Sequence, residues 1–280
     1  MSKFLSGAAS QQFDSDVKQT YQGMGGLAST VTTRDNVVGS TYHFRKIGKG
    51  LANKKGTSEE VSPMGITHTL IPAVLENWNA PEYTDIFDAA TVNFDEKSEL
   101  AEVLAGSIGR REDQLIIDAL DASATYAGTV TKDIGGADTD HNIEKWQRTS
   151  RYLNDKGVPG SGRHILMTAA GLEAMLGETK VQSSDYNTVK ALVNGEMNSF
   201  VGLMPHIIEA RDEDGLTITA TIRDGYAYHD KAVGLARGIN IQTSVDWIPT
   251  RTSWLCNAIL KAGSVVRDPN GVVKIQTKEA

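Results

Sequence analysis

The chain has 280 residues, of which 40% are hydrophobic and 22% charged, an ordinary globular composition for one large domain or two modest ones. Its net charge of −7 and pI of about 5.4 disfavour a general nucleic-acid-binding protein, which would be basic. The single cysteine, Cys256, excludes an intrachain disulfide, and its apolar neighbours predict a small core residue.

Residues 1–35 are mostly small and polar. They lack the apolar segment of a secretion signal, and no apolar run in the chain approaches the roughly 18 residues of a membrane span. We therefore expect a soluble protein made in the cytoplasm, with no membrane partner. The weak periodicity of this stretch predicts an extended N-terminal arm with one short helix.

Residues 36–80 are predicted to form an extended β-hairpin loop. Strand-like arms at 37–47 and 66–75 flank a basic, glycine-rich tip at 48–56. Arms of roughly 12 to 15 residues, at about 3.3 Å per residue, put the tip about 40–50 Å from the base. A compact chain of this size has a radius of gyration of only about 19 Å. We therefore expect the loop to lie on another copy of the chain.

Lysines give this loop a charge opposite to that of the rest of the chain. Residues 1–57 carry eight basic and three acidic side chains, although the whole chain has 28 basic and 35 acidic ones. Charge complementarity between a basic tip and an acidic body favours contact between subunits. The alternative is a solvated loop that its lysines keep soluble. The residues predicted to contact a neighbouring subunit are Lys46, Lys49, Lys54 and Lys55.

From Asn93 the pattern becomes helical, with apolar and small residues at three- and four-residue steps that predict about 28 residues of helix. Asn93 or Asp95 caps the first turn, and Glu96 fits a capping box with Asn93. Gly106 and Gly109 each cost about 1 kcal/mol relative to alanine, so we expect close packing or a bend there. The inward positions are Leu100, Val103, Leu104, Ser107, Ile108, Arg111, Leu115, Ile116, Ala119 and Leu120.

The stretch from 128 to 200 is predicted to contain a compact mixed lobe. Residues 128–141 have the composition of a loop, and Asn142 caps a helix that Gly157 ends. A strand at 163–167 and a short helix at 169–176 follow, and Ser184 or Asp185 starts another helix. The inward positions of the first helix are Ile143, Trp146, Thr149, Ser150 and Leu153.

After Phe200 the chain is predicted to be mostly strand. Residues 203–209 form one strand, and 216–223 form another in which alternate residues are buried. Residues 239–247 show the same alternation, with the buried face at Ile239, Ile241, Val245 and Trp247. Strands at 254–260 and 272–277 follow. An antiparallel sheet packed on the long helix buries both, which gives an α+β fold.

The sequence carries no constellation typical of catalysis or of cofactor or metal binding. Ser107 belongs to a near match to a nucleophile elbow, but it lies inside the helical period, whereas an elbow needs a strand, a sharp turn and a helix. The loop with Asp138, Asp140 and His141 is explained more simply as the approach to an Asn-capped helix than as a cation site. An oligomeric hydrolase that uses Ser107 or this loop is the weakest alternative. We expect no enzyme, no cofactor and no metal.

The order of these elements resembles that of the major capsid protein of tailed double-stranded DNA bacteriophages, with the Hong Kong-type capsid fold. That order is an N-terminal arm, an extended β-hairpin loop, a long spine helix, a mixed axial domain and an antiparallel peripheral sheet. The resemblance covers essentially the whole chain. The amino-acid sequence also resembles that of family members in the stretches 82–88, 92–96, 109–115, 229–236, 245–249 and 261–263.

The resemblance implies a division of the chain. Residues 1–35 would be the N-terminal arm and 36–80 the extended loop. Residues 81–139 would be the peripheral domain with the spine helix, and 140–200 the axial domain. Residues 201–280 would be returning strands that complete both domains.

The resemblance also implies a function without catalysis, as the structural subunit of an icosahedral phage capsid. Hexamers and pentamers of the chain would enclose the double-stranded DNA genome and contact it non-specifically. The arm is too short and too weakly helical to act as a scaffold, so a separate scaffolding protein and a portal protein are expected partners. The protein would be part of the virion, assembled in the cytoplasm of a host bacterium. The alternative is an encapsulin-like shell of a cellular nanocompartment.

Overall fold

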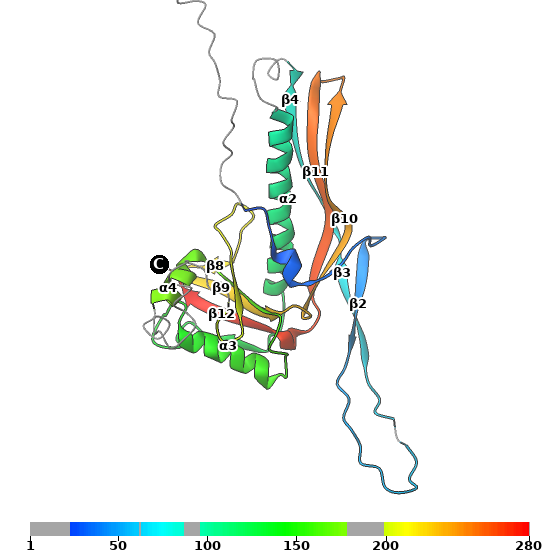
Figure 1. Ribbon diagram of the computed structural model, residues 1–280, viewed down its shortest axis with the longest axis vertical. Coiled ribbons are helices and arrows are strands. Elements are labelled where there is room, and N and C mark those ends of the chain that lie inside the picture. Colours follow the sequence, from blue (N-terminus) through cyan, green and yellow to red (C-terminus); the bar gives the residue numbers. More distant parts are fainter. Residues whose placement is uncertain (1–22, 62, 87–95, 178–198, 280) are drawn as a thin grey trace, which may run out of the picture.

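The computed structural model describes residues 23–61, 63–86, 96–177 and 199–279. Figure 1 shows a long helix and long strands that extend from a compact lobe toward one end of the molecule, and a hairpin that projects toward the opposite end. The helical segments are η1 (Leu27–Thr30), α2 (Glu96–Asp121), α3 (Ile143–Asp155), α4 (Ala169–Gly177) and η2 (Pro269–Gly271). The strands are β1 (Thr32–Arg34), β2 (Thr41–Ile47), β3 (His68–Val74), β4 (Glu76–Asp85), β5 (Gly128–Val130), β6 (Arg163–Met167), β7 (Met204–Ile207), β8 (Ile218–Thr219), β9 (Ile222–His229), β10 (Val233–Ile248), β11 (Ser253–Val266) and β12 (Val272–Lys278).

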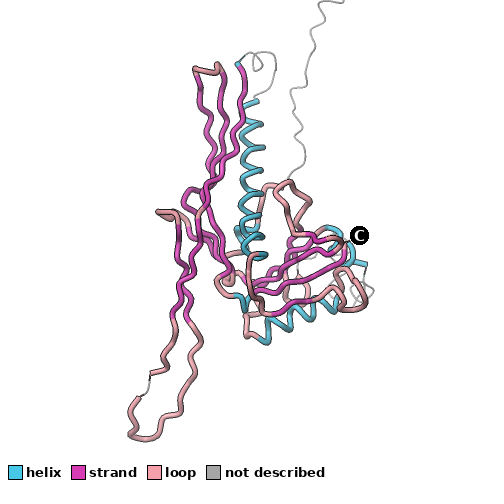
Figure 2. Tube along the Cα trace, turned by 180° about the vertical axis from the view of Figure 1, so that it is seen from behind, coloured by secondary structure: helices cyan, strands magenta, loops and turns pink. Residues whose placement is uncertain are grey.

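The long sheet has the strand order β1-β10-β11-β4, and α2 packs against it. Its long strands pair antiparallel as predicted, while β1 adds in parallel to β10. Figure 2 shows the helix from behind, running beside these strands. The predicted inward positions Ile108, Leu115, Ile116 and Leu120 are buried, and Ile117 joins them. The predicted cap at Asn93 or Asp95 lies outside the described residues.

The second sheet has the order β5-β12-β9-β6-β7, with β8 paired to β9, and it forms the core of the compact lobe. The Oδ1 atom of Asn142 accepts a hydrogen bond from the backbone N–H of Lys145 at 2.8 Å, which confirms the predicted helix cap. All five predicted inward positions of α3 are buried. Gly157, with a φ of +71°, follows the end of α3 as expected. The helix predicted from Ser184 or Asp185 lies outside the described residues.

Two local predictions in this region are wrong. The stretch 128–141 is not all loop, because β5 pairs in parallel with β12. The stretch 216–223 is not one half-buried strand, because the chain reverses at Ala220, where φ is +58°. The reversal pairs Ile218 with Arg223 and leaves Ile218 48% exposed. Alternating apolar residues and threonines imitate a strand here, and no glycine or proline marks the turn.

The predicted burial along 239–247 is also wrong for the isolated chain. These residues do lie in β10, but nine consecutive side chains from Ile239 to Trp247 are exposed. The first four residues of β10, from Val233 to Ala236, are buried. The apolar alternation therefore marks a surface that this chain alone does not cover.

Candidate inter-subunit surface

The predicted hairpin is present, although its paired part is shorter than expected. β2 and β3 pair antiparallel over seven residues each, from Thr41 opposite Val74 to Ile47 opposite His68. One more hydrogen bond follows, from the N–H of Gly48 to the carbonyl of Thr67 at 2.8 Å. Beyond it, the described residues from 49 to 66 lie in no helix or strand. The glycines and the proline of this stretch disfavour strand pairing, which accounts for the difference.

The base of the hairpin is fixed to the body by a small core of its own. Phe44, Ala73 and Leu75 pack with Ala236 of β10, and all four are buried. A Cβ atom at Gly234 would lie 2.7 Å from the ring of Phe44, so only glycine lets the ring approach the strand. The guanidinium of Arg267 lies over the same ring, 5.2 Å from its centroid. The direction in which the hairpin leaves the body is therefore set by packing at its base.

The rest of the loop exposes an unusual number of large apolar side chains. Ile47, Leu70 and Val74 are 61–63% exposed on the paired strands. Between them, the exposed fractions are 82% for Leu51, 73% for Val61, 55% for Met64 and 41% for Ile66. Large apolar side chains exposed together in one segment are typical of a contact with another molecule.

The four predicted lysines do not share one environment. Lys46 lies in β2, and its Nζ atom forms an ion pair with Asp268 of the same chain at 2.9 Å. The Nζ atom of Lys49 donates to the carbonyl of Lys156 at 3.2 Å, also within the chain. Lys54 and Lys55 lie in the loop and are exposed. The last two are therefore the best placed to meet a neighbour, and the role of all four stays a prediction.

The far end of the long sheet is the second exposed surface. Trp247 of β10 packs against Trp254 of β11, with ring centroids 5.3 Å apart, yet it remains 38% exposed. Beside them, the guanidinium of Arg251 lies 4.5 Å from the ring centroid of Tyr83. Figure 1 shows this end of β10, β11 and β4 at the opposite end of the molecule from the hairpin.

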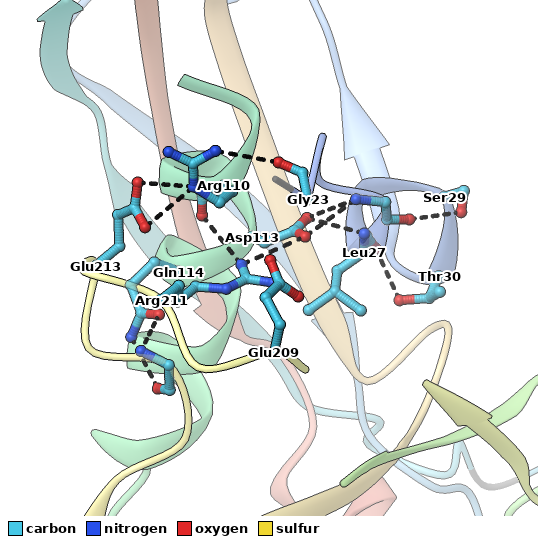
Figure 3. A network of polar contacts seen from close by, with 12 residues as sticks. Gly23, Leu27, Ser29, Thr30, Arg110, Asp113, Gln114, Glu209, Arg211 and Glu213 are labelled. Carbon is cyan, nitrogen blue, oxygen red and sulfur yellow. Dashed lines mark hydrogen bonds and ion pairs between the residues drawn. The ribbon is translucent and has the colours of Figure 1, made fainter. Parts of the chain in front are cut away.

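A polar network fixes the root of the N-terminal arm to α2 (Figure 3). The carboxylate of Asp113 accepts hydrogen bonds from the N–H of Leu27 at 2.8 Å and of Gly26 at 3.0 Å. Arg110 donates to the carbonyl of Gly23 at 3.2 Å. Burial raises the pKa of Asp113, although the two N–H groups and Arg211 act in the opposite direction. Sequence reasoning missed this network, because its members lie more than 80 residues apart.

A cavity of about 490 Å³ lies beside this root, between residues 23–27, Leu172 of α4 and the segment 205–211. Arg211, whose side chain is 3% exposed, lies 3.7 Å from Asp113 and 2.7 Å from Glu209. Its charge is therefore balanced within the chain. The cavity therefore adjoins the attachment of the arm and is lined on its other side by α4 and the segment 205–211.

The residues considered for catalysis have structural roles. The hydroxyl of Ser107 donates to the carbonyl of Leu104 at 2.8 Å, inside α2. Asp138 pairs with Lys132, and His141 is 4% exposed. Burial, aided by Lys145, lowers the pKa of His141 to about 3.

Among the described residues, no group of three or more His, Cys, Asp or Glu side chains is arranged to hold a metal ion. None of the described helices is long and apolar enough to cross a membrane.

Comparison with known proteins bears on this architecture. A family model described as phage capsid protein matches residues 5–279. No curated protein is significantly similar to the chain in sequence. The structure is similar to the capsid of cyanophage P-SCSP1u, with a TM-score of 0.75 and 12% identity over 99% of this chain and 94% of that one.

Two other phage structures are similar over nearly their full length. The head structure of Helicobacter pylori bacteriophage KHP40 gives a TM-score of 0.77 at 8% identity, over 95% of each chain. The capsid of Ralstonia phage GP4 gives 0.75 at 9% identity, over 97% of this chain and 96% of that one. At such low identity the likeness establishes the fold. Since the family model matches almost every residue, the chain belongs to the phage capsid protein family.

Proposed function

We propose that this chain assembles into hexamers and pentamers that tile an icosahedral shell around double-stranded DNA. The observation that carries the proposal is the loop between β2 and β3, which exposes Leu51, Val61, Met64 and Ile66 at 41–82%. Covering one such side chain is worth about 1.5–3 kcal/mol. Membership of a capsid family supplies the partner, a second copy of the chain, and favours a capsid over an encapsulin-like compartment.

The loop suits a shell because its base is packed against the body and its far end exposes apolar side chains that a neighbouring subunit can cover. Packing around Phe44 holds the base, so the apolar residues beyond Ile47 extend in a set direction. Each subunit contributes one such contact and receives another, and many weak contacts add up in a closed shell. Lys54 and Lys55 contribute long-range attraction to the acidic remainder of a neighbouring copy.

The proposal includes the domain division of the chain and its partners in assembly. Residues 81–139 form the peripheral domain and 140–200 most of the axial domain, with 201–280 completing both. A separate scaffolding protein directs assembly, and a portal protein occupies one vertex. DNA is contacted without sequence preference, since the acidic body does not favour a specific nucleic-acid site.

A charge reversal at the loop tests the proposal. In the Lys49→Glu, Lys54→Glu, Lys55→Glu variant, we expect a folded subunit with nearly unchanged thermal unfolding, because the three side chains are exposed and the bond lost, from Lys49 to the carbonyl of Lys156, lies at the surface. We expect shell formation at physiological salt, measured by negative-stain microscopy, to be strongly impaired. The matched control replaces the same three lysines with arginine, keeps the charge and assembles. Normal assembly of the glutamate variant would refute the electrostatic role of the tip.

A further inference from the structure

Two histidines on neighbouring strands of the compact lobe are in direct contact. The Nδ1 atom of His164 in β6 lies 2.9 Å from the Nε2 atom of His206 in β7. Their ring centroids are 5.0 Å apart. The two strands pair in parallel, with His164 opposite Met204 and His206 opposite Leu166. Since both side chains start from paired strands, the sheet itself fixes the contact.

The surroundings of β6 hold the first of these rings in place. β6 is an inner strand, and β9 pairs with its other edge so that His164 lies opposite Tyr228. The rings of these two residues have centroids 5.8 Å apart. Tyr228 and both chain neighbours of His164, Arg163 and Ile165, are buried. Side chains on packed strands keep their geometry better than side chains on loops.

The histidine pair is partly open to solvent. Both residues are half-buried, and His206 lines the cavity of about 490 Å³ beside the root of the N-terminal arm. Within the described part of the chain, no other hydrogen bond reaches either ring. Each ring can therefore carry its proton on the nitrogen that faces away from the other ring, which leaves two lone pairs at the contact.

Both imidazoles are uncharged near neutral pH. Burial lowers the pKa of His164 to about 4, and it also lowers the pKa of His206. The neutral imidazole is the form in which histidine binds a metal ion.

The charged groups around the pair are acidic on balance. Asp230 lies near enough to His164 to favour a positive charge there, and His229 acts in the opposite direction. On the cavity side, the wall carries two carboxylates and one guanidinium, from Asp113, Glu209 and Arg211. Such surroundings favour a cation over an anion.

We propose that His164 and His206 form a two-histidine site for a divalent transition metal, Cu²⁺ or Ni²⁺ in preference to Zn²⁺, with water in the remaining positions. With metal–nitrogen bonds of about 2.0–2.1 Å, a right angle at the metal separates two ligand nitrogens by about 2.8–3.0 Å, and a tetrahedral angle by about 3.3–3.4 Å. The 2.9 Å between the two nitrogens fits the right angle of square-planar and octahedral sites. Each ring has to turn only until its lone pair points at the metal.

A plain hydrogen bond between two imidazoles is the competing explanation, because one ring can donate to the other without any ion. Among the described residues, no third His, Cys, Asp or Glu side chain completes a metal-binding group with the pair. The site is therefore open, and we expect it to bind more weakly than a closed structural metal site with four protein ligands. A bound ion would tie the four-residue strand β7 to β6 beside the arm root.

Metal titration of the unassembled chain tests the site. Isothermal titration calorimetry at neutral pH, in a buffer that does not bind metals, should show one Ni²⁺ or Cu²⁺ per chain. Electron paramagnetic resonance of the Cu²⁺ form should show two imidazole nitrogens. Ni²⁺ should also raise the temperature of thermal unfolding, because the paired strands that form the site exist in the folded chain alone.

Glutamine variants separate a metal ligand from a hydrogen-bond partner. The side chain of His206→Gln can still hydrogen-bond to His164 but offers no imidazole nitrogen. The affinity should therefore fall at least about tenfold, and one nitrogen should disappear from the Cu²⁺ spectrum. His164→Gln repeats the test from the other strand. The matched control combines His43→Gln with His68→Gln, two exposed histidines of the hairpin, and should leave both readouts unchanged.

Three results would overturn the site. They are no saturable binding by the unmodified chain, a Cu²⁺ spectrum with fewer than two imidazole nitrogens, and binding that the glutamine variants leave unchanged. The first two are measured on the unmodified chain and so do not depend on how the variants fold. None of these measurements needs an assembled particle, so their outcome is independent of the proposed function.

Discussion

Replacing Gly109 by alanine sets two effects of opposite sign against each other. Gly109 lies inside α2, where alanine is normally favoured by about 1 kcal/mol. Here its Cβ atom would collide with the carbonyl oxygen of Met24, in the arm that crosses the helix. Gly25, with a φ of +81°, closes the contact from the other side, since a Cβ atom there would lie 2.5 Å from the carbonyl oxygen of Gly109. Both partners are backbone, so relief requires the arm to move.

The size of the effect follows from what the moving arm would lose. The bonds from Gly26 and Leu27 to Asp113 are 3.0 and 2.8 Å long, and hydrogen bonds to charged groups contribute about 1.5–3 kcal/mol each. Losing one to two of them outweighs the gain in helix propensity. We expect Gly109→Ala to lower the free energy of unfolding by about 2–3 kcal/mol. Urea denaturation of the unassembled chain at neutral pH measures this.

A double-mutant cycle shows whether both residues act through the arm. Asp113→Ala removes the same two hydrogen bonds and one partner of buried Arg211, so we expect a loss of about 3 kcal/mol. The double variant should then cost little more than the larger single change, with a coupling energy of about 2 kcal/mol. A Gly109→Ala variant as stable as the unmodified chain, or strictly additive losses, would refute the reasoning.

Two further predictions concern the compact lobe. Gly171→Ala should lower the free energy of unfolding by about 1–3 kcal/mol in urea denaturation, because its Cβ atom would collide with the ring of buried His141. Gly177→Ala is the control in the same helix. Its Cβ atom would meet open space, so the variant should be neutral or slightly stabilising in the same assay. Burial lowers the pKa of His141 to about 3 and of His164 to about 4 in the folded chain. As the pH drops below about 6.5, the two histidines of the unfolded chain bind protons while those of the folded chain stay neutral. The free energy of unfolding should therefore fall between about pH 6.5 and 4. His141→Gln should make the free energy of unfolding depend less steeply on pH than in the unmodified chain. An identical pH dependence would contradict a lowered pKa of His141 in the folded chain.

The elements that the sequence predicts well are those with local signals. The cap at Asn142, the strand at 163–167 and the stripe on α2 each follow from residues close together in the chain. The sequence predicts the hairpin at 36–80 because glycines and lysines separate two strand-like arms. Its paired length was overestimated, since propensity does not indicate where two arms part.

Features that depend on distant contacts escaped prediction. Asp113 looks like an ordinary helix carboxylate until the fold brings Gly26 and Leu27 to it. Lys145 was not predicted to be buried, yet its Nζ atom donates to the carbonyls of Thr139 and Gln276, and burial lowers its pKa to about 8. The apolar alternation of β10 was recognised, but the chain does not bury it by itself.

Electron cryo-microscopy of the assembled particle tests the central claim most directly. The account predicts residues 48–67 of each subunit in contact with a second copy, with Leu51, Val61 and Ile66 covered there. A map in which this segment touches only its own subunit, with those side chains still facing solvent, would contradict it.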